Sequence, residues 1–443
     1  MKRLAILLLL TTPLFAAATR NDDTCDIGLY PAATLLLPYF EVDVESRANS
    51  GESTIFTVTN TGPRPQAARV TLWTDYAFPV ISFNLYLTGY DVQKINLYDI
   101  IVNGRIAPDT DMGSETSPTG ELSDETSPGL DEQSCVELPQ TLPRVFIERM
   151  QSAFRTGRVP TLGTVEGCNT AGGVHQNAVG YATIDVVAAC TGSLPIETHY
   201  FTHEIRFDNV LIGDYIQLHG GQDYAQGNPM VHIRAIPEGG QVSSRRKSNL
   251  TRTFYSNLQQ TAGNRTLDAR QPLPSTFATR WIEGGPGGFQ TFYKIWRESG
   301  SGPKTECSAY PVNAWLPFIE AVRFDEQENP ETSYGEVVTI PMPDSRRLPS
   351  AALVTSETEV IFPPNTQGDI AGWMYLNMHD STDARVASQN WVTASMRAEG
   401  RFSVDLDAVS LGNGCTPALA SSSAQPQPPA TAVPIGPAPN INP

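Results

Sequence analysis

The sequence predicts a mainly β fold in which two related β-sandwich units flank a mixed α+β central segment. Three observations predict this architecture. The chain contains 35 glycines and 35 prolines, which favour strands joined by turns over long helices. Several runs alternate apolar and polar residues, as half-buried strands do. A block of residues near the N-terminus recurs near the C-terminus, and 443 residues suffice for two or three domains.

Residues 1–18 are expected to be a secretory signal peptide. Lys2 and Arg3 precede a short apolar run over residues 4–10, and residues 16–18 are alanines of the kind that precede a cleavage site. A membrane-spanning helix needs roughly 18 to 20 continuous apolar residues, and no segment of the chain reaches that length. We therefore expect an exported protein without a membrane span, located in the periplasm, on the cell surface or in the medium.

The formal net charge of −17 restricts the partners that the chain can have. A strongly acidic surface repels the phosphate backbone of nucleic acids, so we expect no nucleic-acid partner. Acidity also keeps an exported protein soluble, which is the simpler explanation of the charge.

The first β-sandwich unit is expected over residues 19–135. The clearest strand covers residues 81–88, where every second residue is apolar. Two further runs of β-branched residues cover residues 54–60 and 68–74, and Thr61, Gly62 and Pro63 between them are typical of a turn.

The residues from Thr57 to Pro63, followed by those from Ala68 to Leu72, resemble the strand-turn-strand opening of immunoglobulin-like repeats in secreted or surface bacterial proteins. The resemblance is confined to residues 54–74. It implies a β-sandwich fold and, where such repeats have a function, display or adhesion. It implies no catalytic residues.

Two segments are expected to be disordered. The first unit contains an acidic loop at residues 108–134, with no Lys or Arg between Arg105 and Arg144. Residues 416–443 form a tail of mostly Ser, Ala, Gln and Pro, which predicts a flexible extension.

The acidic loop also permits a calcium hypothesis, because Asp109 and Asp111 have the spacing of the first two ligands of an EF-hand loop. The third ligand and the distal glutamate of that motif are missing. We therefore predict no cofactor and keep calcium as the alternative.

The second β-sandwich unit, over residues 304–415, is predicted from the internal repeat. At one fixed offset, 10 of 29 aligned positions are identical, where chance gives about 2. The repeated residues include Gly51-Glu52, Pro65, Val70-Thr71 and Phe78-Pro79, which recur as Gly335-Glu336, Pro349, Val354-Thr355 and Phe362-Pro363. A shared order of strand and turn residues favours duplication over coincidence.

The repeat also predicts a set of disulfide bonds. Six cysteines in an exported chain favour structural bridges. Each predicted unit begins and ends with a cysteine, so equivalent positions are expected to form equivalent bonds. The predicted bonds are Cys25–Cys135, Cys307–Cys415 and Cys168–Cys190.

The central segment, residues 136–303, contains the one persuasive helix, near residues 142–156. Apolar residues recur there at helical spacing. Thr141 is expected to cap the helix, Pro143 suits its first turn, and Gly157 is expected to end it. The apolar stripe is interpreted as core.

Five of the six histidines also fall in the central segment, and His199, His203, Glu204 and Asp208 are candidate metal ligands. On a helix, His199 and His203 would lie on one face. Residues 198–207 alternate like a strand, which would separate the two rings by about 13 Å. We therefore expect a strand, and we interpret the histidines as ordinary core or surface residues that bind no metal.

No catalytic residue is assigned, because the common nucleophile, metal and phosphate-binding motifs are absent from the sequence. The sequence favours an exported, non-enzymatic binding or cell-envelope surface protein with a protein or glycan ligand. The alternative is a secreted hydrolase with a metal-assisted or carboxylate site in the central segment. Convergence of the candidate ligands in a deep pocket would favour the hydrolase.

Overall fold

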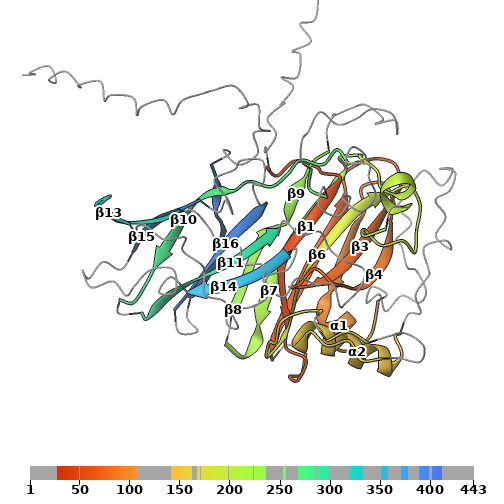
Figure 1. The fold of residues 1–443 in the computed structure, drawn as a ribbon, viewed down its shortest axis with the longest axis horizontal. Coiled ribbons are helices and arrows are strands. Elements are labelled where there is room, and N and C mark those ends of the chain that lie inside the picture. Colours follow the sequence, from red (N-terminus) through yellow and green to blue (C-terminus); the bar gives the residue numbers. More distant parts are fainter. Residues whose placement is uncertain are drawn as a thin grey trace, which may run out of the picture.

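The computed structural model describes part of the chain, over residues 27–48, 50–106, 141–161, 167–169, 171–197, 199–222, 224–235, 253–255, 268–285, 287–298, 320–332, 351–357, 371–377, 389–398 and 402–411. These residues form four antiparallel sheets with few helices (Figure 1). The prediction of a mainly β protein is confirmed.

Two of the sheets face each other and form the N-terminal sandwich. The five-stranded sheet has the order β4 (Pro79–Leu87), β3 (Gln66–Thr74), β6 (Ala178–Val187), β1 (Thr34–Val42) and β9 (Val231–Ile233). The four-stranded sheet has the order β5 (Val92–Asn96), β2 (Glu52–Asn60), β7 (Leu211–His219) and β8 (Tyr224–Pro229).

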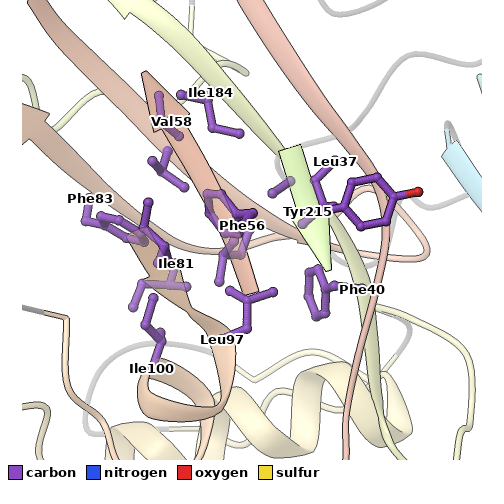
Figure 2. Packing of buried hydrophobic residues seen from close by; sticks show 14 of the residues in the cluster. Leu37, Phe40, Phe56, Val58, Ile81, Phe83, Leu97, Ile100, Ile184 and Tyr215 are labelled. Carbon is purple, nitrogen blue, oxygen red and sulfur yellow. The ribbon is translucent and has the colours of Figure 1, made fainter. Parts of the chain in front are cut away.

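Alternating residues of these strands build the core between the two sheets. Figure 2 shows Phe56 and Val58 of β2 together with Ile81 and Phe83 of β4 and Ile184 of β6. The alternation predicted for residues 81–88 is confirmed, because Ile81, Phe83 and Leu87 are buried in this cluster and Leu85 packs against it. Two helices, α1 (Leu97–Ile101) and α2 (Arg144–Thr156), lie at one end of the sandwich (Figure 1).

The helix predicted near residues 142–156 is confirmed as α2, although its start differs from the prediction. Pro143 occupies the N-cap position and no side chain caps the helix. Thr141, the predicted cap, instead forms a β-bridge with Arg105. Gly157 ends the helix in the left-handed conformation, at φ 62°.

The predicted strands at residues 54–60 and 68–74 correspond to β2 and β3, which belong to opposite sheets. The turn between them therefore crosses the sandwich instead of closing a hairpin. Asn60 holds this turn: its Nδ2 donates to the carbonyl oxygens of Arg64 and Thr88, and its Oδ1 accepts the Gly62 N–H.

The expected separation into two units and a central segment is not confirmed. Strand β6 lies between β1 and β3 and pairs with both, and β7 pairs with β2 along its whole length. Strand pairing thus runs across the boundary expected at residue 135. The physical reason is that the edges of β1, β2 and β3 find their hydrogen-bond partners in strands that come after that boundary.

The other two sheets form the C-terminal sheet pair, which also includes residues from the expected central segment. One sheet has the order β13 (Pro330–Thr332), β12 (Glu320–Asp325), β15 (Ala371–Asn377), β10 (Thr276–Ile282) and β18 (Val409–Ser410). The other has the order β14 (Ala351–Glu357), β11 (Phe289–Glu298), β16 (Asn390–Ala398) and β17 (Phe402–Asp407).

The sandwich and the C-terminal sheet pair share a hydrophobic cluster. The outer side of the five-stranded sheet of the sandwich contributes Trp73 and Tyr181, whose rings stack with centroids 5.8 Å apart. Trp296 of β11 meets Tyr181 edge-on at 6.0 Å. Gln226 of β8 also donates to the Val404 carbonyl oxygen of β17 at 2.5 Å. The five-stranded sheet is therefore buried on both faces.

The internal repeat stays a prediction. Val70 lies in β3 and its counterpart Val354 in β14, whereas Pro349 lies outside the described residues. The expected signal peptide 1–18, acidic loop 108–134 and tail 416–443 also lie outside them.

The disulfide pairing also stays a prediction. Neither Cys168 nor Cys190 is a free thiol, and no bond between the two is seen among the described residues. Cys168 packs in a small cluster with Ala153, whereas Cys190 packs against the cluster shared with the C-terminal sheet pair. The other four cysteines lie outside the part of the chain that is described.

Candidate functional site

A pocket of about 240 Å³ lies on the outer face of the four-stranded sheet of the sandwich. Phe56 and Val58 of β2 point into the core, so the alternate residues of this strand point outward. Outward-facing residues of β2, β7 and β8 form the floor, and the start of α1 and the β1–β2 connection form the walls. The lining residues are Ala48, Gly51, Ser53, Ile55, Asn96, Tyr98, Asp99, Leu218, Gly220 and Ala225.

Hydrogen bonds fix the polar wall of this pocket. Asn96 caps α1, since its Oδ1 accepts the Tyr98 N–H. The Tyr98 hydroxyl donates to the Ser46 carbonyl oxygen at 2.9 Å, and Asp99 Oδ1 accepts from Asn103 Nδ2 at 2.8 Å. Among the described residues, Ser53 Oγ, Asn96 Nδ2 and Asp99 Oδ2 have no hydrogen-bond partner, so they are available to a ligand.

A pair of glutamates lies behind the pocket, between the two sheets. Glu41 is near the end of β1, and Glu52, the first residue of β2, sits between the pocket residues Gly51 and Ser53. Asn177 Nδ2 donates to Glu41 Oε1 at 2.8 Å and also to Glu52 Oε2. The Tyr39 hydroxyl donates to Glu41 Oε2 at 2.5 Å, and the two carboxyl groups hydrogen-bond each other.

The pKa values of the two glutamates move apart. Burial, the hydrogen bond to Glu41 and the charge of Glu41 raise the pKa of Glu52 to about 8. Burial alone would raise the pKa of Glu41, but hydrogen bonds from Glu52, Tyr39 and Asn177 lower it on balance. At neutral pH the pair therefore holds one proton, carried mainly by Glu52.

Cationic groups approach the glutamate pair from the C-terminal sheet pair. Lys294 of β11 lies 4.9 Å from the ring centroid of Tyr39 and donates to Gln217 Oε1. Arg397 of β16 lies over the Phe292 ring. The positive charges of Lys294 and Arg397 lower the pKa of Glu52, although not enough to offset burial and Glu41.

A histidine–aspartate pair interacts with the charge of Glu41. His175 Nε2 is 2.8 Å from Asp75 Oδ2, which also accepts the Gly173 N–H. Burial alone would lower the pKa of His175, but the hydrogen bond and charge of Asp75 raise it on balance, and Glu41 adds to the rise.

A second buried polar cluster, the Asp185 cluster, is fully enclosed. Asp185 accepts hydrogen bonds from Thr34 and, at 2.7 Å each, from the hydroxyls of Tyr200 and Tyr255. Arg270 lies 3.7 Å from Asp185 and 3.3 Å from Asp268. Every side chain of this cluster is at most 2 % exposed, so the cluster stabilises the fold and offers no surface to a ligand.

The strand predicted around His199 and His203 is wrong. Residues Tyr200–Glu204 form one turn of π-helix, and the stacked rings of His199 and His203 lie 4.5 Å apart between centroids. His199 Nε2 is 2.9 Å from Glu204 Oε1. The reason is tertiary: Tyr200 must turn inward to reach Asp185, and this turn brings Phe201 into the core beside it.

The helical turn brings His199, His203 and Glu204 together, but their arrangement does not resemble a metal site. Nearly parallel rings, 20° apart, direct their ring-nitrogen lone pairs side by side rather than toward one point. The side chain of Asp208 forms no hydrogen bond or ion pair with any described residue. Over the described ranges, no group of three or more His, Cys, Asp or Glu side chains is placed to hold a metal ion.

Sequence reasoning missed the glutamate pair, although one signal could have found it. Glu52 falls in the repeated block, where Glu336 is its counterpart. Their partner Asn177 is 125 residues from Glu52, a distance that local patterns do not bridge.

Comparisons with known protein families, with curated proteins and with solved structures found no match to this chain. Within the described ranges, no helix is both long and apolar enough to span a membrane.

Proposed function

We propose that this chain is an exported, non-enzymatic binding protein of the cell envelope or its surroundings. Its ligand would occupy the pocket on the outer face of the β5-β2-β7-β8 sheet. The observation that carries the proposal is the combination, in one pocket, of an apolar floor with three polar groups that are free among the described residues.

The pocket chemistry favours one sugar ring or one protein side chain as the part of the ligand that enters. Ligand pockets usually measure about 300 to 1,000 Å³, so a pocket of about 240 Å³ suits a small group. Ile55, Leu218 and Ala225 offer apolar contact, while Ser53, Asn96 and Asp99 offer both donors and acceptors. Asp99 is the only charged side chain in the lining, which disfavours an anionic group.

To test the proposal, purified protein is applied to glycan and peptide arrays, and a variant with a filled pocket is compared with the natural protein. Ala225→Trp places a large ring over the floor, and we expect it to abolish any binding that the natural protein shows. Ile216→Trp is the matched control, because Ile216 is 45 % exposed on the neighbouring strand and does not line the pocket. Equal loss of binding in both variants, or unchanged binding in Ala225→Trp, would contradict the pocket assignment.

A secreted hydrolase is the second candidate, and the Glu41–Glu52 pair is the observation that favours it. Two carboxyl groups that share a proton can act as acid and base. The pair lies in β1 and β2, however, and not in the expected central segment, and neither glutamate lines the pocket. Glycoside hydrolysis needs carboxyl groups about 5 to 9.5 Å apart, whereas these are hydrogen-bonded to each other. Binding is therefore the function that the geometry supports better.

A further inference from the structure

The Glu41–Glu52 pair joins the two sheets of the sandwich at the β1–β2 connection. Glu41 belongs to the five-stranded sheet and Glu52 to the four-stranded sheet. Neutral hydrogen bonds accompany the pair: the Asp43 N–H donates to the Glu52 carbonyl oxygen at 2.8 Å, and the Glu41 N–H donates to Thr54 Oγ1 at 3.1 Å. The two side chains therefore lie where the sheets are tied together.

One amide group, Asn177 Nδ2, donates to both glutamates, so the two carboxyl groups lie close together, and this arrangement favours a shared proton. Two ionised carboxylates have only acceptors, so they cannot hydrogen-bond each other. Asn177 donates to both groups, but its amide carries no charge to offset two negative ones. When the shared proton leaves, two like charges face each other in a partly buried space and repel.

We propose that the Glu41–Glu52 pair is a proton-dependent clasp, which holds the start of β2 against the end of β1 in neutral solution and loosens in alkaline solution. Because Gly51 and Ser53 flank Glu52 and line the pocket, the clasp also sets the position of one pocket wall. This effect on ligand binding rests on the proposed function, whereas the clasp itself does not.

Several charged and titratable groups face the clasp and set the conditions under which it opens. The positive groups Lys294 and Arg397 approach from β11 and β16 and favour loss of the proton. On β7, His219 is the cross-strand neighbour of Glu52. The Tyr39 hydroxyl on β1 donates a hydrogen bond to Glu41, and His175, which is paired with Asp75, interacts with the charge of Glu41. The positive groups among them moderate the repulsion between the two carboxylates.

Hydrogen–deuterium exchange of the full chain at pH 7 and pH 9 tests the proposal. With the pKa of Glu52 at about 8, the equilibrium constant for closing the clasp should fall about tenfold between these pH values. We expect the amides of the β1–β2 connection, residues 43–52, to lose about tenfold in protection after correction for intrinsic exchange. Glu52→Gln keeps a hydrogen-bonding side chain without a charge, so its protection should not change with pH.

Asp214→Asn is the matched control. Asp214 is an exposed carboxylate on the neighbouring strand β7, and its replacement should leave the tenfold loss intact. If Glu52→Gln does not fold, Glu41→Gln replaces it, because either change removes one of the two charges. A natural protein whose protection is the same at both pH values, or a folded Gln variant that still loses tenfold, would overturn the clasp.

The clasp and the proposed function fail in different ways. A chain that shows the tenfold loss but binds no glycan or peptide probe contradicts the binding function alone. A chain that binds a probe in the pocket at both pH values, without any change in exchange, contradicts the clasp alone.

Discussion

The Asp185 cluster and the Glu41–Glu52 pair are both buried polar groups of the same sandwich, but they differ in the groups that contact their carboxyl oxygens. In the Asp185 cluster, Arg270 lies directly against the carboxylates of Asp185 and Asp268, and the hydroxyl groups of Tyr200 and Tyr255 donate hydrogen bonds to Asp185. In the glutamate pair, two carboxyl groups share one neutral amide, and the nearest cations act from a distance. A cation thus lies directly against both carboxylates of the first cluster, whereas the carboxyl groups of the second are bridged by an uncharged amide.

This difference distinguishes polar groups that stabilise the fold from polar groups that titrate. A fully enclosed carboxylate with a cation in direct contact stabilises one arrangement of the fold. A partly exposed pair that lacks a direct cation exchanges a proton with solvent instead. The same conservative change, from a carboxylate to an amide, should therefore have opposite effects at the two places.

The largest expected effect is at Asp185. Thr34 donates to Asp185 Oδ1, and Tyr200 and Tyr255 donate to Oδ2. Asp185→Asn replaces one of these two acceptor oxygens by an NH2 donor, removes the negative charge, and leaves Arg270 with Asp268 as its remaining carboxylate. Breaking a buried ion pair from one side costs about 3 to 5 kcal/mol, and we expect that loss in urea unfolding at pH 7. A loss below about 1 kcal/mol would show that the contacts of Asp185 with Arg270 and the hydroxyl groups do not stabilise the fold as described.

Removing one hydroxyl from the same cluster should have a smaller effect. Tyr255→Phe keeps the ring packing against Phe201 and Phe254 but removes one donor to Asp185. A hydrogen bond to a charged group contributes about 1.5 to 3 kcal/mol, so we expect a loss of about 2 kcal/mol in the same unfolding experiment. Tyr98→Phe is the control, because its hydroxyl bonds a neutral carbonyl and should cost less.

Some elements of the fold were predictable from the sequence and others were not. The alternation in β4 and the helical spacing in α2 predicted both elements, because one face of each is buried and the other is not. Strand β6 is buried at all ten positions, so it carries no alternation to detect, and its place between β1 and β3 could not be foreseen. Tertiary demands also overrode the strand-like pattern around His199, because Tyr200 bonds Asp185.

At Glu52, replacement of the carboxylate should stabilise the protein instead. The folded pKa of about 8 lies above the ordinary value of 4.5, so the protonated pair contributes fully below about pH 4.5. That contribution is lost as the pH rises through 8. Glu52→Gln has no such loss. We therefore expect its free energy of unfolding at pH 8.5 to exceed that of the natural protein by about 1 to 2 kcal/mol, after allowance for partial exposure.

Urea unfolding of the natural protein and Glu52→Gln from pH 4 to pH 9 measures this difference. The two curves should separate progressively between pH 4.5 and pH 8. Parallel curves over that range would mean that Glu52 titrates normally in the folded protein.

The smallest expected effect is at His175. Asp75 raises the pKa of this histidine, so its contribution to stability is present below the ordinary value of 6.5 and is lost as the pH rises through the folded pKa. In Asp75→Asn, NMR titration of the His175 ring should give a lower pKa than in the natural protein. An unchanged titration would show that the 2.8 Å contact does not persist in solution.

The most direct test of the contrast is infrared difference spectroscopy of the glutamate pair at pH 7. A protonated carboxyl group has a carbonyl band that an ionised carboxylate lacks. We predict one such band at pH 7 that disappears as the pH is raised through 8, and that is missing at pH 7 from Glu52→Gln. If the natural protein shows only carboxylate bands at pH 7, the two glutamates do not share a proton and the contrast with the Asp185 cluster is wrong.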